Sequence, residues 1–173
     1  MYYSIIAKKD ATIYERSESL NSGIDEILEI QKVVSGSNTT NTYNSRILIK
    51  FPLGAISKSV GNGSITNATY SLNLYTVKAK DLAYRYGLEV YPLSQSWEMG
   101  KGRTQTKKQS NSGGLVFEEE GVSWQYRDGK QYFGTTWPTS STGVGGYASG
   151  STGSFATVGG GGAWYTGSSD GTS

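Results

Sequence analysis

The aromatic residues of this sequence are the side chains best suited to ligand chemistry. The chain has 173 residues, of which 4 are Trp and 13 are Tyr, and the apolar face of a sugar ring stacks well on such flat rings. Trp97 and Trp124 are expected to close the ends of a hydrophobic core. The candidate ligand-binding residues are therefore the remaining tryptophans and two tyrosines of the same half of the chain, Trp137, Trp164, Tyr126 and Tyr132.

Two residue types that carry much of enzyme chemistry are missing. The sequence contains neither His nor Cys, which excludes Ser-His-Asp triads, Cys-His dyads and ordinary zinc sites. Catalysis would have to rest on carboxylates, Lys or Tyr, and a glycosidase needs two carboxyl groups held at a set separation. The carboxylate run 118–120 is more typical of a solvated turn. The sequence thus predicts no enzyme, no metal site and no cofactor.

The glycine run and the charge balance point away from nucleotides and nucleic acids. Residues 159–162 are all Gly but are not followed by Lys and Ser or Thr, so they do not form a phosphate-binding loop. The net charge is only +2, with scattered Lys and Arg, and nucleic-acid affinity depends on concentrated positive charge. We expect no nucleic-acid partner, and the sequence shows no secretory signal and no segment of membrane-spanning length.

Alternating apolar and polar residues indicate strands wherever a pattern is legible. In residues 68–77, one face carries Ala68, Tyr70, Leu72 and Leu74, the period of a half-buried strand. Similar reasoning predicts strands at residues 10–15, 27–33, 46–51, 65–75, 88–93 and 115–117. Surface connections are expected at residues 54–63 and 98–114, and from residue 139 onward the chain is rich in Gly, Ser and Thr.

The order of these segments resembles a known domain family. The segments that carry the resemblance are residues 10–15, 20–23, 27–30, 46–53, 65–75, 88–93, 96–98 and 121–124. In this order they resemble the DNRLRE-type domain, a jelly-roll β-sandwich similar to carbohydrate-binding modules. The resemblance covers roughly residues 9–164, and such domains occur in secreted bacterial proteins and as structural modules of tailed phages.

The resemblance implies an all-β fold, an antiparallel jelly-roll β-sandwich with long Gly/Ser/Thr-rich loops. The closing strands that such domains carry are not found before Ser173, so the expectation is a sandwich incomplete at its C-terminus that continues beyond residue 173 or is completed by another copy. We expect residues 1–9 to form an arm or a first strand, and residues 10–173 to form the sandwich domain.

Two functions follow from the resemblance. The first is a structural component of a tailed-phage virion, in a fibre, neck or baseplate, made in the host cytoplasm and partnered by other virion proteins and by copies of itself. Residues 1–9 would then dock onto a neighbouring subunit by strand addition, with Tyr2, Tyr3, Ile5 and Ile6 as the anchor. The alternative is a carbohydrate-binding module for host-surface glycans.

Overall fold

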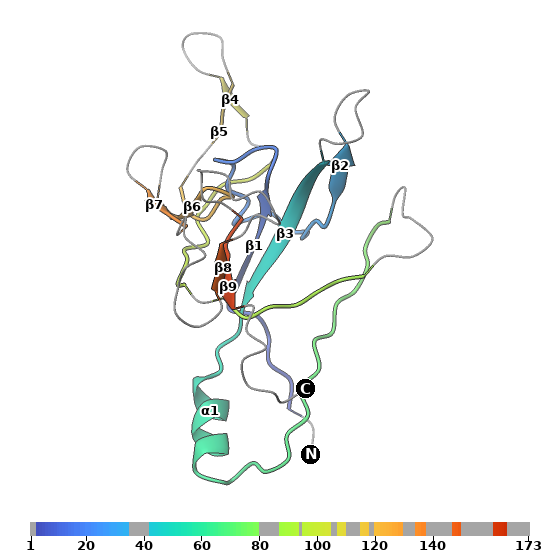
Figure 1. The fold of residues 1–173 in the computed structure, drawn as a ribbon, viewed down its shortest axis with the longest axis vertical. Helices are drawn as coiled ribbons and strands as arrows, with labels where there is room; N and C mark the ends of the chain where they lie inside the picture. Colours follow the sequence, from blue (N-terminus) through green and yellow to red (C-terminus); the bar gives the residue numbers. More distant parts are fainter. Residues whose placement is uncertain are drawn as a thin grey trace.

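The computed structural model describes residues 3–34, 42–79, 87–93, 95–104, 107–109, 115–117, 120–129, 134–137, 147–149 and 161–165. These residues form mostly strands, with one short helix (Figure 1). The elements in chain order are β1 Lys9–Tyr14, β2 Lys32–Val34, β3 Thr42–Lys50, α1 Gly54–Gly61, β4 Lys107–Gln109, β5 Leu115–Phe117, β6 Tyr126–Asp128, β7 Thr135–Thr136, β8 Tyr147–Ser149 and β9 Ala163–Tyr165.

The central sheet has three antiparallel strands in the order β1-β3-β2. Its register places Ala11 opposite Leu48 and Ile13 opposite Arg46. Because opposed residues share a face of the sheet, Ala11, Ile13 and Leu48 form one apolar face, and Arg46 lies on that same face. Three further antiparallel pairs, β4-β5, β6-β7 and β8-β9, lie outside this sheet.

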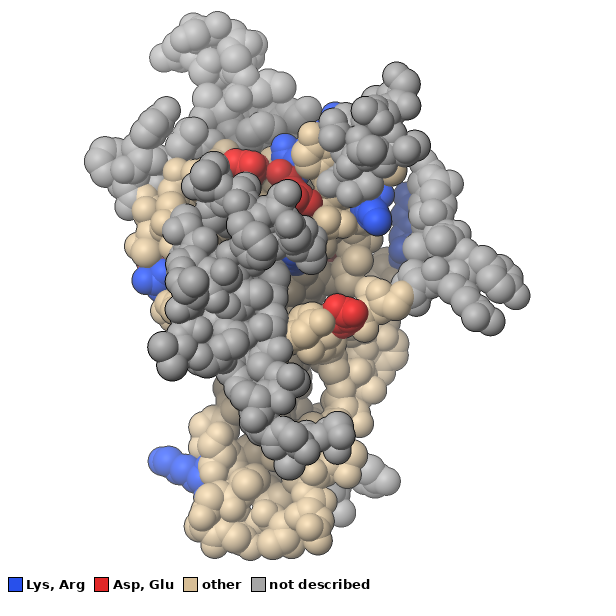
Figure 2. All heavy atoms as spheres, viewed as in Figure 1, with Lys and Arg blue, Asp and Glu red and all other residues tan. Residues whose placement is uncertain are grey.

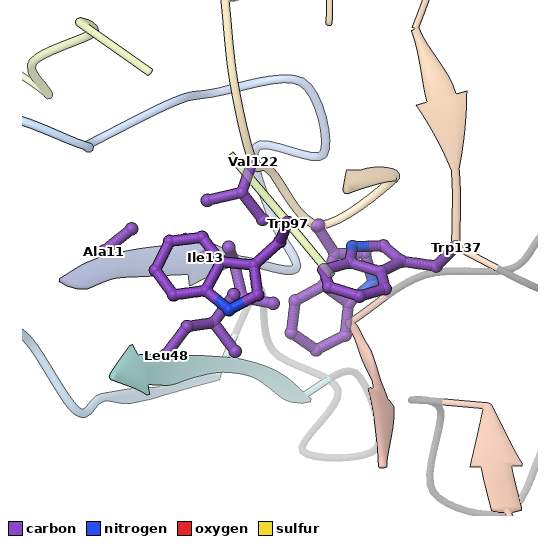
Figure 3. Close-up of a cluster of buried hydrophobic side chains, with 7 residues drawn as sticks. Ala11, Ile13, Leu48, Trp97, Val122 and Trp137 are labelled. Carbon is purple, nitrogen blue, oxygen red and sulfur yellow. The ribbon is translucent and has the colours of Figure 1, made fainter. Parts of the chain in front are cut away.

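The hydrophobic core lies on that apolar face and is built largely from indole rings (Figure 3). Ile13, Val122 and Trp137 are completely buried, and Trp97 and Trp124 are 4% and 5% exposed. The buried cluster consists of Ala11, Ile13, Leu48, Trp97, Val122, Trp124 and Trp137. The expectation that Trp97 and Trp124 belong to the core is confirmed, and residues distant in sequence meet around one small sheet.

The opposite face of β1 is covered by residues 20–31. Thr12 donates its backbone N–H to Ser22 Oγ at 2.9 Å, and Ser22 Oγ donates in turn to Thr12 O at 2.7 Å. Glu29 donates its N–H to Thr12 Oγ1 at 3.0 Å, and Tyr14 donates its hydroxyl to a Glu29 carboxylate oxygen at 3.0 Å. Side-chain hydrogen bonds therefore hold residues 20–31 against β1. They take the place of the backbone hydrogen bonds that a neighbouring strand would make.

Helix α1 and the segment after it lie away from the core (Figure 1). The helix buries none of its residues and has no side-chain hydrogen bond at its N-cap. Every residue from 60 to 79 is exposed, and residues 62–79 carry no strand. Leu88, Val90 and Tyr91, further along the chain, are exposed as well.

Three strand predictions are confirmed, two in the central sheet and one in the separate β4-β5 pair. β1, β3 and β5 correspond to the strands predicted at residues 10–15, 46–51 and 115–117, and β3 ends before Pro52 as expected. Of the strand predicted at residues 27–33, only the last two residues belong to β2.

Other predictions away from the core are wrong. Residues 65–75 form no strand, and residues 88–93 hold only an isolated bridge at Leu93. The physical reason is that a strand needs a paired neighbour, and alternation does not supply one. The connection predicted at residues 54–63 lies at the surface as expected but holds α1, and the one predicted at residues 98–114 includes β4.

Candidate functional site

The buried side chain of Asn21 connects three loops of the chain by hydrogen bonds. Asn21 is 0% exposed. Its Nδ2 donates to Met99 O and to Val122 O, each at 2.7 Å, and its Oδ1 accepts from Gly102 N at 2.7 Å. One amide thereby joins its own loop to two later stretches of the chain, and its donors and its acceptor all have partners, as burial of a polar group requires.

Glycines allow the backbones around this amide to approach one another. Gly100 and Gly121 have φ angles of +79° and +107°, which residues other than Gly rarely adopt. A Cβ on Gly100 would collide with Glu120 O and the Asn21 side chain, and a Cβ on Gly121 would collide with Gly100. The contact of these loops therefore depends on the absence of side chains at both positions.

The same loops enclose an open depression of about 630 Å³. Its walls are joined by backbone hydrogen bonds, from Val122 N to Glu98 O at 2.7 Å and from Gly121 N to Gly129 O at 3.2 Å. It carries three carboxylates and one ammonium group, and its lining is Glu98, Met99, Gly100, Lys101, Glu120, Gly121, Asp128 and Gly129. An open, acidic hollow of this kind suits hydroxyl or cationic donors, including sugar hydroxyls and basic side chains.

Two cations of the central sheet lie over tryptophan rings. Lys9 Nζ lies 4.6 Å from the centre of the Trp97 ring, donates to Trp97 O and approaches Glu98 Oε2 at 3.5 Å. Arg46 lies 4.6 Å from the centre of the Trp124 ring and donates from Nη1 to Gly161 O at 2.7 Å. Cation–π contacts stabilise partly desolvated charges, so each cation ties a tryptophan ring to a strand of the sheet.

Burial alters the acid–base properties of two groups on the sheet. It raises the pKa of the Tyr14 hydroxyl well above its ordinary value, and the bond to Glu29 adds to the effect. Burial lowers the pKa of Arg46 to about 10, while Glu15 acts in the opposite direction. Arg46 is therefore still charged near neutral pH, as its ring and carbonyl contacts require.

The structure separates the candidate ligand-binding residues. Trp137 is 0% exposed and donates from Nε1 to Ser123 O at 3.0 Å, so its ring is part of the core and has no face for a sugar. Tyr126 is half-buried on β6, two residues before Asp128 of the depression. Trp164 lies on β9 opposite Ala148 instead of in a loop, with its side chain outside the described part, and Tyr132 lies outside the described residues.

The structure describes three of the four residues predicted as the N-terminal anchor, namely Tyr3, Ile5 and Ile6. Tyr3 and Ile6 are exposed by 76% and 86%, whereas Ile5 is half-buried. Tyr2 lies outside the described residues. Residues 3–7 precede β1 without regular structure, and Lys8 N continues the pairing with Lys50 O at 2.7 Å.

Neither family models, nor curated proteins, nor solved structures match this chain. In the part of the chain that the structure describes, no three acidic residues gather as ligands for a metal ion. The described helix is too short and too polar to cross a membrane.

Sequence reasoning missed the residues that organise the site. Asn21, Gly100 and Gly121 belong to stretches that read as ordinary turns, because Asn and Gly are common turn formers. The nearest available signal is Gly121 before the buried pair Val122 and Trp124. Nothing in the sequence shows that an amide near residue 20 bonds to carbonyls near residues 99 and 122.

Proposed function

We propose that this chain is a structural component of a tailed-phage virion that acts through protein–protein assembly, and that it is not an enzyme. The phage assignment rests on the resemblance of its segments to the DNRLRE-type domain. The finer architecture proposed with it is an antiparallel jelly-roll β-sandwich. The described residues support an assembly role in two ways.

The observation that carries the proposal is the distribution of apolar side chains. Among the described residues, 17 large apolar side chains are exposed, whereas 9 hydrophobic residues are buried. Monomeric proteins rarely leave contiguous apolar patches in water, and such patches commonly mark protein interfaces. The exposed residues are also grouped along the chain, since those beyond α1 fall within residues 65–77 and residues 88–91.

A second support is the position of the exposed N-terminal residues. Tyr3 and Ile6 stand directly before β1, whose first residues pair with the central strand β3. An apolar segment that continues a strand is well placed to extend onto a neighbouring subunit. The arm therefore offers a contact that is separate from the sheet core.

Peptide mass spectrometry across a density gradient of the source lysate tests the proposal. The expected result is that peptides of this chain follow intact particles and the recognised capsid or tail proteins in constant proportion. Recovery of the chain only in the soluble fractions, with none in purified particles, would overturn the virion role.

Glycan binding is the second candidate, and Tyr126 is the observation that favours it. Tyr126 is a half-buried residue of β6, two residues before Asp128, which lines the depression together with Glu98 and Glu120. A stacking ring next to carboxylate acceptors is the combination that sugar-binding sites use. Binding would be recognition of host glycans by an assembled particle.

Substitution separates this second role from the first. On a glycan array, Tyr126→Ala is expected to lose signal by tenfold or more, while Tyr91→Ala, which changes an exposed tyrosine outside β6, keeps it. Equal signals from both variants and the wild type would exclude Tyr126 as a glycan contact.

A further inference from the structure

Residues 68–77 have the chemistry of a strand but pair with no strand in the part of the chain that the structure describes. The segment begins after Asn67, whose φ of +55° turns the backbone, and it contains no Gly, no Pro and no charged residue. In the described structure no backbone hydrogen bond is formed from residue 68 to residue 77. At about 3.3 Å per residue, ten such residues extend over roughly 33 Å.

One face of this segment is apolar and lies in water. Tyr70, Leu72 and Leu74 alternate with Ser71 and Asn73, and the exposed fractions of the three apolar residues are 67%, 44% and 52%. On the face that Figure 2 shows, the described residues at the bottom of the molecule, where Figure 1 places α1, are mostly uncharged, with a basic side chain at the left edge. Uncharged segments with high β-propensity pair readily with other strands.

The described sheets of this chain do not offer an edge that matches the segment. β3 is the longest described strand and is paired on both sides. The outer edge of β1 is occupied at Thr12 by Ser22 Oγ and at Tyr14 by Ser17 N. β2 has only three residues, which is too short for a strand of ten.

A second copy of the same segment does match. In an antiparallel pair centred on Leu72, Tyr70 stands opposite Leu74 and Thr69 opposite Tyr75, so both apolar faces fall on the same side. Registers shifted by one residue place apolar side chains opposite polar ones. Since the strand has no charge, it meets no like charge when it faces itself.

We propose that residues 68–77 form an antiparallel strand pair with the same residues of a second copy of this chain, with Leu72 facing Leu72 across a two-fold axis. A closed two-fold contact of this kind gives a dimer. This inference rests on the proposed assembly function and deepens it by naming the partner and the contact.

Sedimentation of the full chain at several concentrations gives the first test. The wild type is expected to show a reversible monomer–dimer equilibrium. Leu72→Lys places two ammonium groups opposite each other and is expected to weaken the dimer at least tenfold. Leu53→Lys changes a leucine of matching exposure, 48% against 44%, outside the segment, and is expected to leave the dimer unchanged.

Disulfide trapping gives the second test. Because the sequence has no native Cys, a disulfide can form only between the introduced residues. Leu72→Cys is expected to give a covalent dimer under mild oxidation, because directly opposed strand residues have Cβ atoms close enough for a disulfide. Leu53→Cys is the control and is expected to remain monomeric on reducing-agent-free gels.

Several outcomes would overturn the inference. They are a wild type that is monomeric at all concentrations, a dimer that Leu72→Lys does not weaken, or a dimer that Leu72→Cys does not trap. These results are separable from the virion role. A monomeric chain that still follows intact particles excludes only the self-pairing, whereas a trapped dimer absent from particles excludes only the virion role.

Discussion

Single residues near the Asn21 amide set the geometry of the loops. The amide satisfies carbonyls of residues 99 and 122 and an N–H of residue 102. These partners lie on two separate stretches of the chain. The amide therefore cross-links distant parts of the chain, as a disulfide or a metal ion does in other small folds. Its removal leaves buried polar groups without partners.

Asn21→Ala is accordingly expected to lower the free energy of unfolding by about 3 kcal/mol or more, because each buried polar group left without a partner costs about 1–3 kcal/mol. Urea unfolding followed by tryptophan fluorescence measures the loss. Thr66→Ala, at an exposed position outside residues 68–77, is the control and is expected to change stability by less than about 0.5 kcal/mol. Equal losses in both variants would contradict a bracing role for the amide.

The raised pKa of Tyr14 predicts how the free energy of unfolding changes at alkaline pH. The pKa of its hydroxyl is raised by burial and by Glu29, so the folded chain keeps a proton that the unfolded chain releases. That contribution to stability is complete below the ordinary tyrosine pKa of about 10 and is lost progressively as the pH rises from there toward the folded-state value.

The measurement is the urea midpoint at about pH 8 and about pH 10.5, below and above the ordinary tyrosine pKa. The wild type is expected to lose more stability between them than Tyr14→Phe does. Arg46, whose lowered pKa acts in the opposite direction, is present in both proteins and so does not alter the comparison. An identical loss in both would show that Tyr14 does not carry the effect.

Among the elements, the short β6-β7 pair positions Trp137, which directly follows β7 and lies in the core. The ring is fully buried and its N–H is bonded to Ser123 O. Trp137→Ala is expected to cost about 3–5 kcal/mol, the usual range for removal of a buried large aromatic side chain. Thermal unfolding by circular dichroism measures it, and Trp137→Phe, which keeps a ring, is expected to lose less. A fully stable alanine variant would contradict the core assignment.

Helix α1 should be the least protected regular element among those described. It has eight residues, buries none of them and lacks a side-chain cap, and isolated helices shorter than about 12 residues are marginal in water. Hydrogen exchange is expected to be fast at Gly54–Gly61 and slow in β1 and β3. Comparable protection in all three elements would show that α1 packs against a partner.

The sequence predicts β1 and β3, which alternate and pair with each other, and it fails for segments that alternate without a paired strand. β1 and β3 are rich in β-branched and apolar residues and end at clear turn signals. Residues 68–77 alternate just as well as β3 does, so alternation alone cannot tell a strand with a partner from one without. The Asn21 hydrogen bonds escape prediction for a related reason, since they join residues whose distance in sequence carries no periodic pattern.

The sequence predicts which types of residue form the candidate site, but not which residues come together there. Aromatic side chains are expected, and Tyr126 lies two residues before Asp128, which lines the depression with Glu98 and Glu120. Trp137 reads as a loop residue because Pro138 and a Gly-rich stretch come after it. Burial of its ring depends on contacts with the distant core, which no local composition reveals.

The whole molecule combines a small, indole-rich core with a wide apolar periphery. If the second copy binds the folded state, mass action raises the unfolding temperature with protein concentration. We expect the midpoint of the wild type to rise over a hundredfold concentration range, and that of Leu72→Lys to stay nearly constant. Differential scanning fluorimetry measures both, and a concentration-independent midpoint for the wild type would contradict stabilising association.

The hydroxyl of Ser22 has an effect on the number of directions in which the central sheet can grow. By occupying both backbone groups of Thr12 it stands in for a neighbouring strand at that position. An unpaired strand edge is a template for pairing with another chain, so the Ser22 hydroxyl protects this edge of the sheet against edge-to-edge aggregation.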